Sequence, residues 1–315
     1  MQRCLHGTVN NVSMNSFQLK VLACVLMVID HVAEFLPGMP IWMHWVGRLS
    51  APIFYFLIGW SCVYTSNRKR FLLRLYIASV GMSVIQALSS VFASSWPELP
   101  IDLIENNIFA TLFQMSLVIC LLSAPTWRKR LRNISIYALV QLAISVPMYF
   151  LRGIVYDLPY GEALNCILLR ASGTVLDLEG GLFAVAIGVV LWATHDHRLR
   201  LSLALVGLAA TDLVLSASSV LYSITVALMY RFPDPARAVI TMTQIWDVMG
   251  FSLFNAGQSP ITVNYQWMKV FALPFMLVYN HQRGPRVKWF FYIFYPAHIV
   301  VLYLIGTAMN IFMAG

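Results

Sequence analysis

The sequence predicts an all-α protein, a polytopic bundle of about nine to eleven transmembrane helices. Of its 315 residues, 59% are hydrophobic and only 11% are charged, and the mean hydropathy is +0.73. A soluble domain of ordinary composition has about a quarter of its residues charged. Apolar runs close to the roughly 20 residues that cross a bilayer recur along almost the whole chain. We therefore expect a single integral membrane domain over residues 1–315.

Nine apolar segments are expected to form the membrane-spanning helices, in order along the chain and with short polar connections between them. The first follows a polar leader and has no small-residue cleavage site behind it, so we expect it to remain as a helix. The segments are 19–36, 46–65, 71–93, 107–124, 133–151, 178–193, 199–221, 264–280 and 289–312.

Basic residues indicate how these helices are oriented. The net charge of +8 is concentrated in short clusters that fall in every second connection, as the positive-inside rule requires of cytoplasmic loops. The charge thus reflects membrane topology and not a nucleic-acid partner, and it places the N-terminus in the cytoplasm. The clusters are "NRKRFLLR" (67–74), "WRKRLR" (127–132), "HDHRLR" (195–200) and "HQRGPRVK" (281–288).

Residues 222–263 do not fit this regular layout, because the apolar stretches "ITVALMY" and "AVITMTQIWDVMGFSLF" are separated by "RFPDPAR". The segment forms either an outer loop with interfacial helices or a helical hairpin. Two full spans here would raise the helix number to eleven and preserve the orientation of the last two helices. We expect an insertion on the outer side.

The first apolar segment contains "LMVIDHVAEF", which has three titratable residues within five positions, Asp30, His31 and Glu34. His31 lies about 16 Å along the helix from Lys20 at 1.5 Å per residue, near the middle of the bilayer. A charged group at this depth costs roughly 2.5 to 3.5 kcal/mol, so it normally faces a cavity or a partner. Asp30 and His31 diverge by about 100° and should contact different neighbours. We expect Arg48, at the outer end of the second segment, to pair with Asp30 or Glu34.

The last segment supplies a second histidine near mid-depth. In "KWFFYIFYPAHIVVLYLI", Pro296 interrupts the backbone hydrogen bonding, and Tyr295 and His298 flank it. At the entrance to the sixth segment, "LDLEGG" carries Asp177 and Glu179, and we expect Asp177 either to cap the helix or to face the cavity. The five cysteines are scattered without ligand spacing, and His195 with His197 is weak evidence for a metal, so we expect no metal site.

Five stretches together resemble the TraX family of bacterial membrane proteins, named for the acetyltransferase that modifies the N-terminus of conjugative pilin. They are "LKVLACVLMVIDHVAEF", "GRLSAPIFYFLIG", "NNIFATLFQMSLVI", "VFALPFMLVYNHQRG" and "KWFFYIFYPAHIVVLYLI". The first two helices are also similar to those of the wider polytopic acyltransferases, in which an early membrane histidine is catalytic. The chain departs from the family pattern at 222–263 and at "YNHQRG", which leaves the acceptor open.

The resemblance implies an acetyl-CoA-dependent acetyltransferase in the bacterial inner membrane, with an acceptor presented at the outer side. His31 is then the general base, because a histidine near its ordinary pKa of about 6.5 takes a proton at neutral pH. Asp30, Arg48 and His298 complete the expected catalytic group, and Tyr295, Asp177 and Glu34 are expected to bind the acceptor or the oxyanion. A covalent acetyl-histidine remains an alternative to direct attack.

The partners expected on this basis are acetyl-CoA, the outer acceptor and membrane lipid. The acceptor is a peptide N-terminus, an amino sugar or a hydroxyl. The alternatives are O-acetylation of a cell-surface glycan and a proton-coupled transporter, which would use the same intramembrane polar residues. The phosphates of acetyl-CoA call for cations in the basic connections, and the candidates are Arg68, Lys69, Arg70, Arg128, Lys129, Arg130, Arg283 and Arg286.

Overall fold

The computed structural model describes residues 13–285 and 287–314, and their regular secondary structure is helical. The elements are α1 (Ser16–Phe35), α2 (Trp42–Gly47), α3 (Ser50–Tyr64), α4 (Arg68–Ser95), α5 (Ile108–Leu122), α6 (Trp127–Tyr156), α7 (Gly161–Ser172), α8 (Gly181–Thr194), α9 (Arg198–Ala217), α10 (Val220–Met229), α11 (Pro235–Met249), the 3-10 helix η1 (Tyr265–Ala272), α12 (Leu273–Leu277) and α13 (Lys288–Ala314).

The all-α, multi-pass prediction is confirmed. Each of the nine predicted segments coincides with one helix or with two consecutive helices, α2 with α3 and η1 with α12. Helices α5 and α8 are apolar but have only 15 and 14 residues, so the total of nine to eleven crossings remains a prediction. The six stretches that are long and apolar enough to cross a membrane are Ser16–Phe35, Trp42–Tyr64, Arg68–Ser95, Trp127–Tyr156, Arg198–Ala217 and Trp289–Met313.

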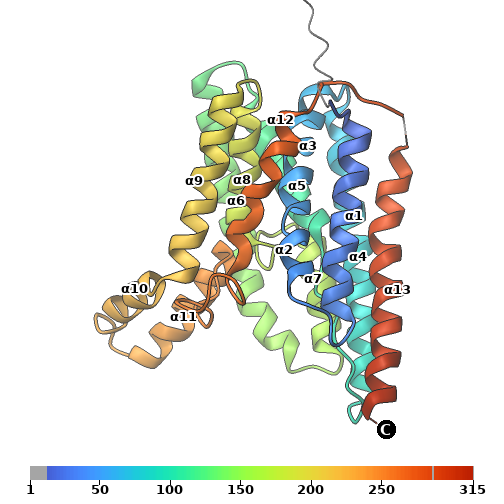
Figure 1. The fold of residues 1–315 in the computed structure, drawn as a ribbon. Helices are drawn as coiled ribbons and strands as arrows, with labels where there is room; N and C mark the ends of the chain where they lie inside the picture. Colours follow the sequence, from blue (N-terminus) through green and yellow to red (C-terminus); the bar gives the residue numbers. More distant parts are fainter. Residues whose placement is uncertain (1–12, 286, 315) are drawn as a thin grey trace, which may run out of the picture.

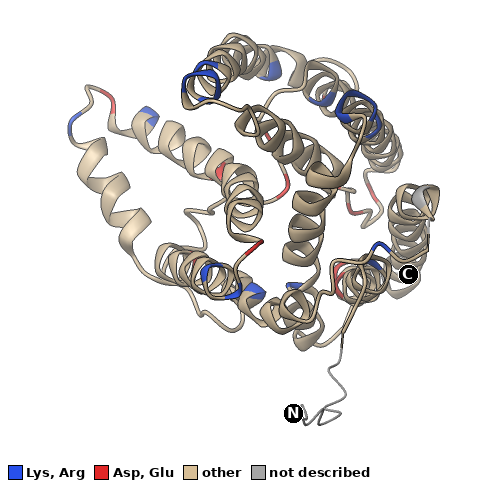
Figure 2. Ribbon diagram, turned by 90° about the horizontal axis from the view of Figure 1, so that it is seen from above, with Lys and Arg blue, Asp and Glu red and all other residues tan. Residues whose placement is uncertain are grey.

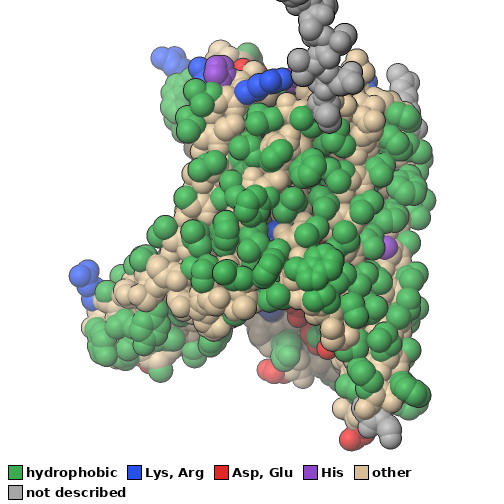
Figure 3. All heavy atoms as spheres, viewed as in Figure 1, with side chains coloured by type: hydrophobic (Ala, Val, Ile, Leu, Met, Phe, Trp, Pro, Cys, Tyr) green, Lys and Arg blue, Asp and Glu red, His purple; other side chains and the backbone are tan. Residues whose placement is uncertain are grey.

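The long helices run roughly parallel to one axis, and α10 and α11 lie across it (Figure 1). On the face shown in Figure 3, most Lys and Arg side chains lie at the upper end and most Asp and Glu side chains at the lower end. Seen from above, Lys and Arg positions lie on several separate helices around the bundle (Figure 2). We call the upper end, where α4 and α6 begin with Arg68 and Trp127, the basic end. The positive-inside rule predicts that it faces the cytoplasm.

Helix α1 begins with a capping box that the sequence specifies. The Asn15 side chain accepts the Gln18 N–H, and the Gln18 side chain accepts the Asn15 N–H, which satisfies two free backbone donors. The helix ends at Phe35, before Pro37 and Gly38, and Gly38 takes a left-handed conformation with φ +74°. Helix α1 packs against α2, α3 and α13, so the polar residues that it carries lie among these helices.

Small residues let the helices approach closely, which is how helices associate within a bilayer. A methyl group at Gly47 would overlap the Asp30 side chain, and one at Gly188 would overlap Met115. These two positions bring α2 against α1 and α8 against α5. Because Gly47 has no side chain, α2 can pack directly against Asp30 of α1.

Residues 222–263 form part of a short helical arm at the end opposite the basic end (Figure 1). The arm consists of α10 and α11, and the Trp246 indole N–H joins them by donating to Thr225 at 3.0 Å. At 10 and 15 residues, each of these helices is shorter than the roughly 20 residues of a full span. Gly250, with φ +96°, packs its backbone against Gly181 at the start of α8. The segment therefore contains two short helices and not the two full spans of the hairpin alternative, and its place on the outer side stays a prediction.

Candidate functional site

Helices α1 and α13 bring the two predicted mid-depth histidines together. The Nδ1 atom of His31 lies 2.7 Å from Nε2 of His298, and Nδ1 of His298 lies 2.8 Å from the carbonyl oxygen of Phe294. The two rings are nearly parallel, with centroids 5.0 Å apart. His31 is 5% exposed, so this contact lies inside the bundle.

The hydrogen-bond chain fixes which nitrogens carry protons when both rings are neutral. The Phe294 carbonyl can only accept, so Nδ1 of His298 is protonated and its Nε2 is an acceptor. Nδ1 of His31 must then donate to that acceptor. This leaves Nε2 of His31 with a free lone pair, 3.7 Å from a carboxylate oxygen of Glu34. His31 thus has the tautomer that a general base requires.

Asp30 faces away from this pair and joins three elements. It accepts hydrogen bonds from the Arg48 guanidinium, as the sequence predicted, and from Nδ1 of His44 at 2.8 Å. Arg48 also donates to Gln266 at 3.3 Å and lies over the ring of Tyr265, 5.6 Å from its centroid. Asp30 thus links α1 to α2 through His44 and to η1 through Arg48.

The loop before α5 binds two further carboxylates. The Asn106 side chain donates to both oxygens of Glu34 at 2.9 and 3.2 Å. The next backbone N–H, of Asn107, donates to Glu179 at 2.9 Å, and the Tyr295 hydroxyl lies 3.3 Å from the same oxygen of Glu179. Glu179 lies in the loop between α7 and α8.

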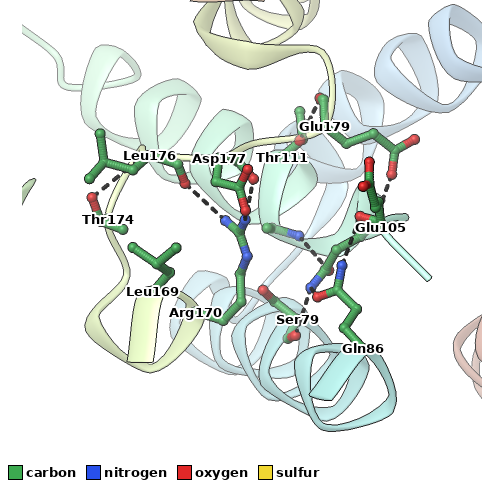
Figure 4. A network of polar contacts seen from close by, with 12 residues as sticks. Ser79, Gln86, Glu105, Thr111, Leu169, Arg170, Thr174, Leu176, Asp177 and Glu179 are labelled. Carbon is green, nitrogen blue, oxygen red and sulfur yellow. Dashed lines mark hydrogen bonds and ion pairs between the residues drawn. The ribbon is translucent and has the colours of Figure 1, made fainter. Parts of the chain in front are cut away.

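Asp177 occupies a different place from its neighbour Glu179 (Figure 4). It adopts a left-handed conformation with φ 59°, and its carboxylate forms a 3.0 Å ion pair with Arg170 of α7. Arg170 also donates to the carbonyl of Leu176 at 3.2 Å. Asp177 lines the same cavity as His31, and its ion pair with Arg170 holds the loop before α8 against α7.

Two cavities enter the bundle and share part of their lining. One, of about 550 Å³, extends from the basic end, and we call it the basic cavity. The other, of about 680 Å³, contains His31, and we call it the acidic cavity. Both are lined by Met27, Ile108 and Tyr295. These shared residues lie next to His31, because the centroids of the Tyr295 and His31 rings are 6.4 Å apart.

The two cavities carry opposite charge. Among the described residues that line the basic cavity there are three fixed cations, Lys20, Arg74 and Arg283, and no carboxylate. Aromatic rings such as Trp60, Tyr64 and Phe291 form much of its wall. In the acidic cavity three cations, Arg48, Arg152 and Lys269, face seven of the chain's 13 carboxylates. The seven are Asp30, Glu34, Glu105, Glu162, Asp177, Glu179 and Asp212.

Of the cations predicted to bind acetyl-CoA that the structure describes, one lines the basic cavity. Arg283 lines the basic cavity and donates to the Tyr64 carbonyl at 3.1 Å. Arg68, Lys69 and Arg70 begin α4 and Arg128, Lys129 and Arg130 begin α6; all are exposed at the basic end and outside the lining of that cavity. Arg286 lies outside the described residues. Lys20 and Arg74 line the cavity but were not predicted, since a basic residue at a helix end is already explained by topology.

Two more residues of the acidic cavity escaped the sequence reasoning, His44 and Glu179. His44 follows the first helix in a connection with no charge pattern, and only the fold brings it to Asp30. Glu179 was noted beside Asp177, but only Asp177 was expected to contribute to the site. Within residues 13–285 and 287–314, no group of three or more His, Cys, Asp and Glu is placed to hold a metal ion.

Comparison with protein families bears directly on this site. The family model described as TraX protein matches residues 16–306. The chain belongs to the TraX family. The matched TraX region extends from the first residue of α1 to Gly306 in α13, and so contains every residue that lines the two cavities. No curated protein and no solved structure matches the chain.

Proposed function

We propose that this TraX protein is an acetyltransferase of the bacterial inner membrane. It moves an acetyl group from cytoplasmic acetyl-CoA to an amine presented at the outer side, with His31 as general base. The observation that carries the proposal is the meeting of two oppositely charged cavities at Met27, Ile108 and Tyr295, beside the free Nε2 of His31.

The basic cavity suits the donor. Acetyl-CoA has a phosphorylated nucleotide at one end and a thioester at the other, joined by a long, narrow arm. Lys20, Arg74 and Arg283 offer charge to the phosphates, and the aromatic wall offers stacking surface to the nucleotide base. The arm then extends toward Tyr295, so that the thioester reaches the junction from the cytoplasmic side.

The acidic cavity suits a cationic acceptor. Asp30, Asp177 and Asp212 each have a cation within salt-bridge distance, whereas the four glutamates Glu34, Glu105, Glu162 and Glu179 have no Lys or Arg that close among the described residues. A protonated amine is attracted to this excess of negative charge. This favours an amine, such as a peptide N-terminus, over a hydroxyl.

In the proposed reaction the acceptor nitrogen attacks the thioester carbonyl while Nε2 of His31 takes its proton. His298 keeps the imidazole in the required tautomer, and Glu34 stabilises the imidazolium that forms. The Tyr295 hydroxyl, which lines both cavities, donates to the developing oxyanion. The proton on His31 then passes to the sulfur of the leaving CoA thiolate.

Purified protein in detergent, supplied with radiolabelled acetyl-CoA and a short peptide that has a free N-terminus, tests the proposal. We expect transfer of label to the peptide, and we expect His31→Ala to reduce it by roughly 10²- to 10⁴-fold. His197→Ala, at the exposed start of α9, is the matched control and should retain full transfer. Size-exclusion profiles establish that both variants fold.

Two results would overturn this assignment. A wild-type protein that transfers no label to an amine contradicts the function, and a His31→Ala variant with full activity contradicts the base. An otherwise identical peptide with a blocked N-terminus and a free serine hydroxyl distinguishes N-acetylation from O-acetylation. We expect it to accept no label.

A further inference from the structure

Glu179 lines the acidic cavity, and its carboxylate contacts the hydroxyl of Tyr295, which lines both cavities. Its Oε2 atom receives the Asn107 N–H at 2.9 Å and lies 3.3 Å from the Tyr295 hydroxyl. The Tyr295 oxygen also accepts the backbone N–H of Ile108 at 3.1 Å. The Glu179 carbonyl is held by the Thr111 hydroxyl at 2.8 Å, so the loop that carries this residue is fixed (Figure 4).

An amine acceptor needs two proton acceptors, and His31 supplies only one. A primary amine in water near pH 7 is mostly an ammonium ion, which must lose one proton before it has a lone pair and a second proton as the C–N bond forms. Nδ1 of His31 is already bonded to His298, so Nε2 can take one of these protons. When the ammonium form enters the site, a second group has to take the other.

Glu34 is poorly placed for that task. It lies 3.7 Å from Nε2 of His31, where its negative charge is needed to stabilise the imidazolium. Glu179 has no Lys or Arg within 4.0 Å among the described residues, and it is bound to the same Asn106–Asn107 loop as Glu34. It is therefore the carboxylate that is near the site and free of an ion pair.

We propose that Glu179 takes the first proton from the ammonium group of the acceptor and, once protonated, donates to Tyr295 so that the tyrosine O–H turns to the thioester oxygen. The inference rests on the proposed function. A tyrosine oxygen has two lone pairs, and Ile108 N–H and protonated Glu179 would fill both. The Tyr295 proton would then be available for the oxyanion when the amine becomes nucleophilic.

The protons and bonds balance. An ammonium ion and acetyl-CoA become an acetamide, CoA thiol and one released proton. The C–N bond forms and the C–S bond breaks. The first proton goes to Glu179 and leaves through the acidic cavity, and the second goes to His31 and then to the sulfur of CoA.

The charged and titratable groups that face Glu179 are Glu34 on α1, Arg48 after α2, Tyr55 on α3 and Tyr295 on α13.

Two acceptor probes and two substitutions test the inference. A peptide α-amine has a pKa of about 7.7–8.0, so roughly one molecule in six to eleven is neutral at pH 7, whereas methoxyamine is already neutral there. Glu179→Gln removes the proton acceptor; with its amide nitrogen at the place of Oε2 it donates to Tyr295, as a protonated carboxyl would, but it no longer accepts from Asn107. Glu179→Ala removes both functions. Glu98→Gln, an exposed glutamate that lines neither cavity, is the control.

At pH 7 we expect Glu179→Gln to lower kcat/KM for the peptide roughly six- to elevenfold, to leave transfer to methoxyamine within about threefold, and to regain peptide transfer by pH 9. Glu179→Ala should slow both probes. Equal loss with both probes in Glu179→Gln, or no loss with either, overturns the role of Glu179 while the acetyltransferase assignment stands. A wild-type protein that acetylates neither probe instead overturns the proposed function, and with it the inference.

Discussion

The imidazoles of His31 and His298 lie 2.7 Å apart, although 267 residues separate them in the chain. The contact extends through His298 to the Phe294 carbonyl. An imidazole on α1 is therefore held in one tautomer by a group on α13. The first and last long helices of the described chain thus contribute side chains to one polar site.

Loss of the His298 side chain should misorient the base. We expect His298→Ala to reduce acetyl transfer by roughly 10²-fold, with little change in the KM for acetyl-CoA. A glutamine at 298 offers an amide oxygen near the position of Nε2, so His298→Gln should recover part of the rate. Equal activities for the Ala and Gln variants would indicate that no acceptor is needed at this position.

The ion pair between Asp30 and Arg48 should contribute to stability as well as to activity. Removing Arg48 leaves the Asp30 carboxylate, 8% exposed, with His44 as its remaining partner. We expect Arg48→Ala to lower the free energy of unfolding by about 3 kcal/mol and to lower Tm in detergent. Asp30→Asn, with nearly the same volume, should recover part of that loss when combined with Arg48→Ala. A double variant no more stable than Arg48→Ala argues against an electrostatic cause.

Close packing at Gly47 should affect both the stability of the protein and the rate of acetyl transfer. The methyl group of Gly47→Ala would overlap the Asp30 side chain, so we expect a lower Tm and slower transfer. Gly81→Ala in α4 is a well-matched control, because a methyl group there meets nothing within 4 Å. Alanine favours a helix by roughly 1 kcal/mol over glycine, so the control should be neutral or more stable than wild type. Gly47→Ala with wild-type Tm and rate contradicts this account.

The cations of the basic cavity should determine donor affinity. We expect Arg74→Gln to raise the KM for acetyl-CoA about tenfold, equivalent to about 1.4 kcal/mol, and to leave the KM for the acceptor unchanged. Arg128→Gln tests the alternative from the sequence, that the exposed cluster at the start of α6 binds the phosphates. A larger effect of Arg128→Gln than of Arg74→Gln would move the donor site to that cluster.

The fold could be predicted well from the sequence because the length of an apolar run directly reports a membrane helix. The length of an apolar run does not predict helices α7, α10 and α11. These helices have 12, 10 and 15 residues, and α7 and α11 are amphipathic, with polar residues on one face. Apolar run length alone cannot distinguish such helices from loops.

The site could be predicted only in part. Asp30, His31, Arg48 and His298 stand out because charge within a bilayer is costly, and the structure brings all four to the same region. The choice between Asp177 and Glu179 depends on backbone conformation, since the left-handed turn at Asp177 directs that side chain to Arg170. Lys20 and Arg74 required knowledge of the cavity, which no local pattern encodes.

Met27, Ile108 and Tyr295 separate the two cavities, and they are 6%, 6% and 4% exposed. In the proposed topology one cavity opens to the cytoplasm and the other to the cell exterior, so these three side chains lie between two aqueous phases. A continuous file of water there would dissipate the proton gradient of the cell. The three residues at which the proposed reaction takes place would therefore also have to prevent protons from leaking across the membrane.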